Sequence, residues 1–387
     1  MVLTTQLHLR RIAKACALAM PAVAIATLLF SAGASAAVVH EAVRRGDSAD
    51  NQGVVGLVTG SSSDVSVRIA EDIASVVDDG ATRRVLPVIG KGSQHNLIDL
   101  MALRGIDMAI LQTDVLESAR ANRLVPGLEG AISYITQLQN LEFHLLARSD
   151  IASVRDLAQQ KVNFDLRGSG TAVTAGALFS LLKIPVQSTN DSQDTALAKL
   201  RSGEIAAIAF VAAKPAELFQ RLKSSEGFHF LAIPLEETIA AYPPTNLSAA
   251  DYPELVPQNQ TVDTLAVGTV LAVVNFPPGS ARYSNMANFV DAFFTGFQAL
   301  LEPGHLAAWK DINIAAELPG WRRFLPADQW LKRNAAVAIK PTPEDLKSTF
   351  SRFIDKRQEL VGGASMTQQQ KDELFNRFER WQSAQPH

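Results

Sequence analysis

Short apolar segments alternate with amphipathic ones between residues 53 and 148, and this alternation constrains the fold most strongly. Gly53–Thr59 has the composition of a strand, and Val65–Val77 has the apolar spacing of a helix. Further strands are predicted at Arg84–Ile89, Met108–Leu111 and Glu142–Arg148, and a further helix at Gln94–Leu103. Strands and helices in this order predict an α/β fold with a doubly wound parallel sheet.

Polar turns follow three of the predicted strands, at Ser61–Asp64, Gly90–Gln94 and Gln112–Asp114. Each turn alone is typical of ordinary turn chemistry. Ligands of open α/β sheets bind outside the carboxyl ends of parallel strands, so the convergence of these turns predicts a binding site. The candidate ligand-binding residues among them are Ser62, Ser63, Ser93, Gln94, Gln112 and Asp114.

A fourth turn, Gly168-Ser169-Gly170-Thr171, links a predicted strand at 162–165 to a predicted helix at 172–182. Glycine permits positive φ angles and a close approach of the backbone to a ligand. Hydroxyl groups and unpaired N–H groups at a helix N-terminus attract anions. The pattern therefore predicts that Gly168, Ser169, Gly170 and Thr171 bind a carboxylate or a phosphate. An ordinary turn would use the same residue types, and these four residues alone do not decide the question.

Three charged residues offer further ligand contacts. Arg167 and Lys214 are the candidates for a positive charge that pairs with a bound anion, although each could equally be a solvated surface residue. Asp114 could accept hydrogen bonds from the ammonium group of a ligand, which would favour amino acids. It could equally cap the helix that follows it.

The chain is long enough for two domains, and a second α/β unit is predicted to begin near Asp150. The β-prone segment Val262–Asn275 then returns to the first unit, which predicts two doubly wound α/β lobes joined by a hinge that the chain crosses twice. Two charged amphipathic helices at 341–360 and 367–381 could pack on the body of the protein or dock a partner. The predicted divisions are 1–36 signal peptide, 37–149 lobe I, 150–262 lobe II, 263–334 return to lobe I, and 335–387 helical tail.

The N-terminus predicts export. Arg10, Arg11 and Lys14 precede an apolar run, and Ala34-Ser35-Ala36 is typical of a signal-peptide cleavage site. The alternative is a retained membrane anchor; after cleavage we expect no membrane insertion. The only cysteine, Cys16, would leave with this segment, so the mature protein would have neither disulfide nor thiol chemistry.

Composition and motifs also exclude function classes. Without the signal peptide the chain has 33 basic and 39 acidic residues, a net charge of −6, which disfavours nucleic-acid binding. The seven histidines lack metal-ligand spacing, and no nucleophile elbow, P-loop or dinucleotide fingerprint occurs. We therefore expect no metal, no cofactor and no catalysis.

Several motifs, in order along residues 53–334, resemble the TAXI-type solute-binding proteins of TRAP transporters. The motifs are Gly92-Ser93 with Asn96-Leu97; Leu111-Gln112-Thr113-Asp114; Gly168-Ser169-Gly170-Thr171; Gly203-Glu204-Ile205 with Phe210 and Pro215; and Tyr252-Pro253 ahead of Val262-Asp263-Thr264. The resemblance implies the type II periplasmic binding protein fold, with two α/β lobes around a cleft. It also implies a periplasmic receptor that delivers a small anionic solute, a carboxylate or an amino acid, to a membrane permease subunit. The alternatives are a sensing or protein-interaction subunit and a binding protein for an ABC importer.

Overall fold

The computed structural model describes residues 53–62, 64–234, 238, 241–334, 367, 369–372 and 375. All of them belong to one compact unit, residues 47–387. The predicted signal peptide, Ser63 and nearly all of the predicted helical tail lie outside the described residues. Among the described residues, no helix has the length and apolar character needed to span a membrane.

The first sheet has the strand order β2-β1-β3-β12-β4. Its strands are β1 (Val54–Thr59), β2 (Arg84–Ile89), β3 (Met108–Gln112), β4 (Ile132–Gln137) and β12 (Thr269–Val274). Strands β2, β1 and β3 are parallel, whereas β12 is antiparallel to both β3 and β4. Pro87 lies in the edge strand β2, where the missing N–H is tolerated.

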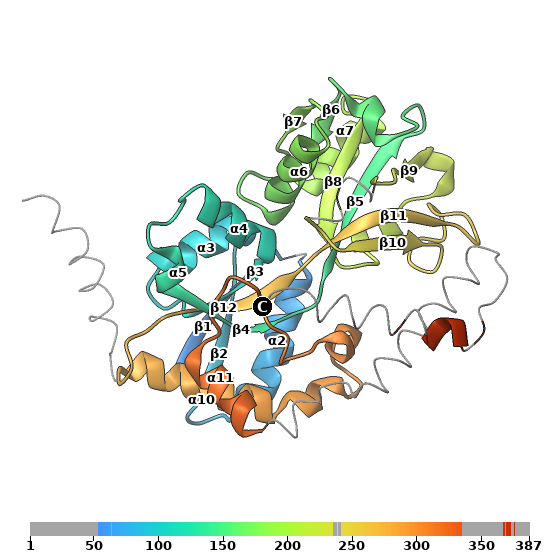
Figure 1. The fold of residues 1–387 in the computed structure, drawn as a ribbon. Coiled ribbons are helices and arrows are strands. Elements are labelled where there is room, and N and C mark those ends of the chain that lie inside the picture. Colours follow the sequence, from blue (N-terminus) through green and yellow to red (C-terminus); the bar gives the residue numbers. More distant parts are fainter. Residues whose placement is uncertain are drawn as a thin grey trace, which may run out of the picture. The chain divides into compact units, whose positions relative to one another are not determined.

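Helices cover both faces of this sheet, which confirms the doubly wound architecture (Figure 1). The prediction that the sheet is parallel was wrong for β12, which is antiparallel to both of its neighbours. The helices on one face are α2 (Val65–Val77), α10 (Ala281–Thr295) and α11 (Leu325–Arg333), and those on the other are α3 (Ser93–Ala102) and α4 (Thr113–Ala121). Successive residues of β1 pack on opposite faces of the sheet. Leu57 packs with Ile73 of α2, and Val58 packs with Leu97 of α3. This alternation follows from the two-residue period of a strand.

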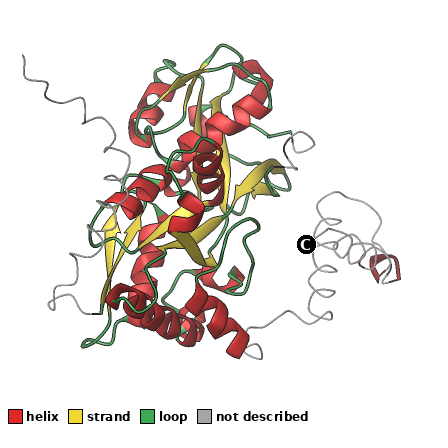
Figure 2. Ribbon diagram, turned by 60° about the vertical axis from the view of Figure 1, so that its left-hand side comes forward, coloured by secondary structure: helices red, strands yellow, loops and turns green. Residues whose placement is uncertain are grey.

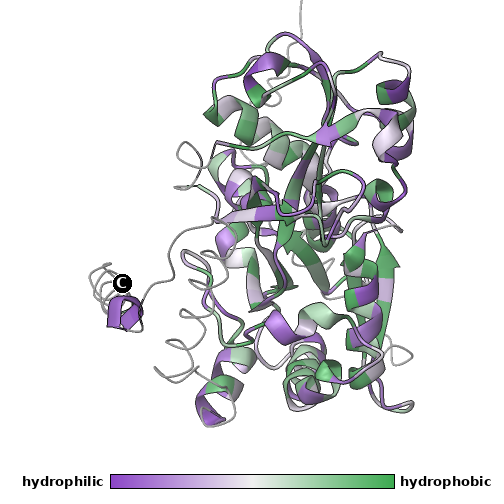
Figure 3. Cartoon of the chain, turned by 90° about the vertical axis from the view of Figure 1, so that its right-hand side faces the viewer, coloured by the Kyte–Doolittle hydropathy of each residue, from purple (hydrophilic) through white to green (hydrophobic). Residues whose placement is uncertain are grey.

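The second sheet has the order β10-β11-β5-β8-β6-β7, and β9 pairs with β5. Its strands are β5 (Leu141–Arg148), β6 (Lys161–Asn163), β7 (Gln187–Thr189), β8 (Ala207–Ala212), β9 (Phe228–Phe230), β10 (Pro244–Ser248) and β11 (Thr261–Val267). Helix α6 (Gly170–Leu181) packs on one face, and α7 (Gln193–Arg201) with α8 (Glu217–Gln220) packs on the other. Figure 2 shows helices on both sides of the strands, and Figure 3 shows that the strands are mainly apolar.

The chain passes between the two sheets twice, at residues 138–140 and at Gly268. The prediction that Glu142–Arg148 belongs to the first sheet was wrong, because β5 pairs with β8 and β11 of the second sheet. The predicted single return strand Val262–Asn275 is two strands, β11 and β12, one in each sheet. Apolar patterning predicts that a segment is a strand but does not say which strand pairs with it. The domain boundaries at 149/150 and 262/263 stay a prediction.

Sequence patterning missed several elements. These are β4, α5 (Leu128–Ala131), α11 and β10. Pro244 and Asn246 disfavour a strand in general. They are tolerated in β10 because it lies at the edge of the sheet and pairs only with β11.

Candidate functional site

The turns after β1, β2 and β3 lie at one edge of the first sheet and are hydrogen-bonded to one another. The Gly90 N–H donates to the Gly60 carbonyl (3.1 Å), and the Gln112 N–H donates to Ser93 Oγ (2.7 Å). The Ser93 hydroxyl therefore helps to hold the end of β3 in place. Ser62 is exposed at the outside of the first turn.

The turn before α6 forms a helix N-terminus as the sequence indicated, although α6 begins at Gly170, earlier than predicted. Ser169 is the N-cap, and its Oγ accepts a hydrogen bond from the Ala172 N–H (3.1 Å). Thr171 Oγ1 accepts from the Val211 N–H (3.1 Å), which fixes α6 to β8. Among the described residues, neither the Gly170 N–H nor the Thr171 N–H has a hydrogen-bond acceptor. These two amides carry the partial positive charge of the helix terminus.

The two lobes meet at Gly168. Its carbonyl accepts hydrogen bonds from the N–H groups of Gln94 and His95, both at 3.2 Å, in the first turn of α3. Gly168 has φ of +80°, and a Cβ at this position would lie 2.1 Å from His95 Cε1. Both the conformation and the contact require glycine. The first turn of α3 is thus engaged by a carbonyl group of the second lobe.

Gln112, at the carboxyl end of β3, faces the start of α6. Its side chain is only 7% exposed. A Cβ on Gly170 would lie 2.0 Å from Gln112 Oε1, so glycine is needed for this approach. Gln112 Oε1 is buried without a hydrogen-bond partner among the described residues. An unpaired buried acceptor is uncommon in a native structure.

Asp114, in the first turn of α4, connects the lobes through two hydroxyl groups. Its Oδ2 accepts from Thr174 Oγ1 (2.6 Å) and from the Tyr242 hydroxyl (3.2 Å). Its Oδ1 is buried and has no partner among the described residues. Burial raises the pKa of Asp114, and the hydrogen bonds from Thr174 and Tyr242 act in the opposite direction. Asp114 is not the N-cap of α4, because that residue is Gln112.

Two further carboxylates lie near this contact. Asp64 is the N-cap of α2, and its Oδ1 accepts from the Ser66 N–H (2.8 Å). Burial raises the pKa of both Asp64 and Asp165, and the charge of Asp64 raises that of Asp165 further. Asp165 also adopts a positive φ of 63° in the loop that leads to α6. In the described part of the chain no lysine, arginine or histidine forms an ion pair with Asp64, Asp114 or Asp165.

The two candidate cations are placed differently. Arg167 is exposed. Lys214 is held within the second lobe, where its Nζ donates to the Asn246 carbonyl (2.6 Å) and lies 3.9 Å from Glu142 Oε1. The ammonium group of Lys214 therefore interacts with groups on β5 and β10 of its own lobe.

Sequence reasoning did not assign ligand or lobe contacts to His95, Asp165, Thr174 or Tyr242. The four-residue spacing of Gly170 and Thr174 places both on one side of α6 and could have indicated Thr174. No local signal indicates Tyr242, which is 128 residues from Asp114.

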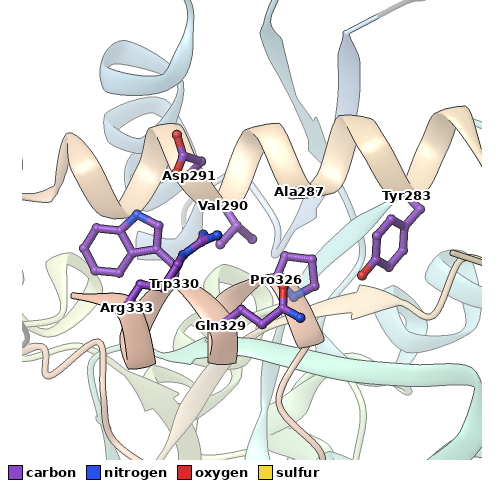
Figure 4. A pocket seen from close by; sticks show the side chains of 8 residues that line it. All are labelled: Tyr283, Ala287, Val290, Asp291, Pro326, Gln329, Trp330 and Arg333. Carbon is purple, nitrogen blue, oxygen red and sulfur yellow. The ribbon is translucent and has the colours of Figure 1, made fainter. Parts of the chain in front are cut away.

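Two cavities lie away from this contact. One, of about 180 Å³, is between α10 and α11, where the side chains of Tyr283, Asp291, Gln329 and Arg333 surround it (Figure 4). The other, of about 320 Å³, is beside Arg148 at the end of α7. Within the described residues no group of three or more His, Cys, Asp or Glu side chains is arranged to hold a metal ion.

The sequence profile of the NMT1-like family matches residues 57–284, which is more than half of the chain. The chain belongs to this family. The matched segment contains α3, β3 and α6, and with them every contact described between α3, Gln112, Asp114 and α6. No curated protein matches the chain.

Solved structures with a similar arrangement include several binding proteins. A TctC solute binding protein from Polaromonas is 17% identical, with a TM-score of 0.36 over 64% of this chain and 88% of that one. The periplasmic binding protein BugD is 10% identical, with a TM-score of 0.44 over 74% and 95%. An amino acid ABC transporter substrate-binding protein from Streptococcus pneumoniae, bound to L-arginine, is 16% identical, with a TM-score of 0.38 over 70% and 98%. These similarities are too low to support an argument about the ligand.

Proposed function

We propose that the protein is an extracytoplasmic solute-binding receptor. It captures a small carboxylate-bearing solute between its two lobes and delivers it to a membrane transporter of the TRAP type. The observation that carries this proposal is the N-terminal turn of α6, where the Gly170 and Thr171 amides have no acceptor among the described residues and the buried Gln112 of the other lobe faces them. A solute carboxylate is the natural acceptor for such amides.

The connections between the sheets support capture by closure. In the part of the chain that the structure describes, only residues 138–140 and Gly268 join the strands of one sheet to those of the other. Short connections of this kind can act as a hinge, since a few residues absorb the change in backbone angles. In the closed arrangement the polar atoms around Gly170 are shielded from water, which strengthens their hydrogen bonds to a solute. Buried atoms such as Gln112 Oε1 become reachable when the lobes separate.

The proposed binding residues are Gln112, Asp114 and Gly168–Thr171, with Ser93 and Gln94 holding the opposing turn. Ser62, Ser63, Arg167 and Lys214 belonged to the site predicted from sequence. Their surroundings, where the structure describes them, give them less direct roles, because Ser62 and Arg167 are exposed and Lys214 is bound to Glu142 and Asn246.

Delivery to a TRAP-type permease, a periplasmic location and the absence of catalysis are proposed from the TAXI resemblance and the predicted export signal. A sensing or protein-interaction subunit with the same fold is the second candidate. The direct bond between Gly168 and α3 favours it, because a protein group there occupies one of the two helix N-termini at the lobe contact.

Thermal unfolding in the presence of solutes tests the proposal. Dicarboxylates, 2-oxo acids and amino acids are added singly to the purified protein after its bound solutes have been removed by unfolding and refolding. Binding to the folded state raises the unfolding midpoint by mass action. We expect one class of solute to raise it, and we expect the rise to be lost in the Ser169→Ala/Thr171→Ala variant. A protein that unfolds cooperatively and responds to none of them would contradict solute capture.

A further inference from the structure

The carboxylate of Asp114 forms a junction between side chains of the two lobes. It accepts hydrogen bonds from two hydroxyl groups of the second lobe, that of Thr174 in α6 (2.6 Å) and that of Tyr242 just before β10 (3.2 Å). Both hydroxyl groups reach the same oxygen atom, Oδ2. Two residues that are far apart in the chain thus converge on one atom of the first lobe.

Each member of this junction is held in place by the packing of its own lobe. Tyr242 belongs to the same apolar cluster of the second lobe as Phe179 of α6, and Thr174 is fully buried on that helix. Asp114 lies in the first turn of α4, whose Leu116 packs in the core of the first lobe. The lobes therefore separate only when both hydrogen bonds break.

The junction lies beside one of the two connections between the sheets. Thr113 immediately precedes Asp114, and its N–H donates to the carbonyl of Gly268 (2.9 Å), the residue that connects β11 to β12. A hinge of this kind rotates through changes in the backbone angles of a few residues. Hydrogen bonds that join the lobes next to the hinge therefore restrain this rotation.

We propose that Asp114, Thr174 and Tyr242 form a hinge lock, in which the two hydroxyl groups hold the lobes together and set how often they separate. The lock consists of protein groups, so it acts on the lobes both with and without a solute. Thr174 and Tyr242 act through Asp114 as positioning residues. In the proposed receptor the lock limits the rate of solute exchange, a consequence that rests on the proposed function.

Distances between spin labels test the lock in protein freed of solutes by unfolding and refolding. The only cysteine of the chain is Cys16, so Cys16→Ser removes any competing label site. Arg104→Cys in the first lobe and Ser188→Cys in the second then carry the labels at exposed positions. Double electron–electron resonance measures the proportions of open and closed molecules. Asp114 is left unaltered in every variant, because it is also among the proposed binding residues.

We expect Thr174→Val and Tyr242→Phe each to raise the ratio of open to closed molecules about tenfold, because each removes one hydrogen bond to a charged acceptor. Thr174→Ser keeps the hydroxyl group and should keep the distances of the unaltered protein. The matched controls are Thr264→Val and Tyr252→Phe. They remove buried hydroxyl groups whose hydrogen-bond partners all belong to the second lobe, so they should lower stability without changing the ratio.

Unchanged distances in Thr174→Val and Tyr242→Phe would overturn the lock, and either variant decides the question if the other does not fold. Equal opening in the two controls would also overturn it, because the loss of any buried hydroxyl group would then be sufficient. This result and the thermal test of solute binding are independent. Opening in a protein that binds no solute would contradict the receptor proposal alone, and binding with unchanged distances would contradict the lock alone.

Discussion

The N-termini of α3 and α6 begin with the same residue types but make different contacts. Gly92-Ser93 opens α3, and its first-turn amides at Gln94 and His95 donate to the Gly168 carbonyl. Ser169-Gly170 opens α6, and its amides at Gly170 and Thr171 have no acceptor among the described residues. The serine hydroxyls differ as well, since Ser93 Oγ holds the Gln112 N–H and Ser169 Oγ caps its own helix.

This difference teaches that a glycine-hydroxyl turn at a helix start does not by itself identify a ligand site. One of the two turns is used to dock a carbonyl group of the opposite lobe. The other retains donors toward a buried amide side chain. What distinguishes them is the group that lies opposite each turn, and that group comes from a distant part of the chain.

The largest effect is expected where the docking is disrupted, in Gly168→Ala. Alanine at a φ of +80° costs about 1–2 kcal/mol, and the contact of its Cβ with His95 adds about 1–3 kcal/mol. We expect the free energy of unfolding to fall by about 2–5 kcal/mol in urea titrations, with faster hydrogen exchange at the Gln94 and His95 amides. Gly176→Ala, in the open middle of α6, is the matched control and should be neutral or stabilising. Unchanged exchange at α3 in the Gly168 variant would contradict the docking role.

A second test concerns Glu142, the carboxylate beside Lys214 that holds the positive charge of this lysine away from both turns. Burial raises the pKa of Glu142 to about 7, although Lys214 opposes this shift. Between about pH 4.5 and about pH 7 the Glu142 carboxyl group is therefore protonated in the folded state but ionised in the unfolded state. The stability that this bound proton contributes is lost as the pH rises from about 4.5 to about 7. Burial lowers the pKa of His144 to about 4, so the folded state holds this histidine neutral. The stability that neutral His144 contributes is therefore lost as the pH falls below 6.5.

The two groups oppose each other in the unaltered protein, and Glu142→Gln removes one of them. On going from pH 7 to pH 5 we expect this variant to lose about 1–3 kcal/mol of stability relative to the unaltered protein. Urea unfolding at pH 5, 6 and 7 measures the difference. Glu302→Gln, which removes the same charge from an exposed side chain, is the control. Parallel stability curves for the Glu142 variant and the unaltered protein would show that Glu142 is not the group concerned.

The serine hydroxyls provide a smaller contrast. Ser93→Ala leaves the buried Gln112 N–H without its acceptor, which costs about 1–3 kcal/mol. Ser169→Ala removes an N-cap, which costs about 1 kcal/mol. We therefore expect Ser93→Ala to be the more destabilising of the two, by about 1 kcal/mol in urea unfolding. The reverse order would mean that the turn before α6, and not the one before α3, holds the lobe contact together.

The smallest effect is expected at Ser62, which sequence patterning placed in the site. Its side chain is exposed, so Ser62→Ala should change the free energy of unfolding by less than about 0.5 kcal/mol. It should also leave the affinity for a bound solute unchanged in calorimetric titration. A tenfold loss of affinity would return the first turn to the binding site.

Local patterning predicted the elements whose evidence is local. Helix α2 and strand β2 have the predicted bounds, and Ser169 caps α6 as its hydroxyl suggested. The meeting of the turns after β1, β2 and β3 could also be predicted, because parallel strands end at a common edge. Pairing between distant strands could not, and β5 was consequently placed in the wrong sheet.

The same limit applies to the candidate site. The amides of Gly170 and Thr171 follow from the turn itself, but the groups opposite them do not. Tyr242 reaches Asp114 across 128 residues, and Lys214 is drawn to Glu142 across 72 in its backbone hydrogen bond. Such contacts depend on how the sheets are assembled, and no window of sequence contains both partners.

The central claim is that a small solute binds at the start of α6 between the lobes. The most direct measurement is a titration of the ¹⁵N-labelled protein, followed by the backbone amide signals, with whichever amino acid or carboxylate raises the unfolding midpoint most. We expect the signals of Gly170 and Thr171 to shift most and their exchange with solvent to slow on binding. A solute that binds but leaves both signals unchanged, and shifts those of residues around the cavity between α10 and α11, would contradict the account.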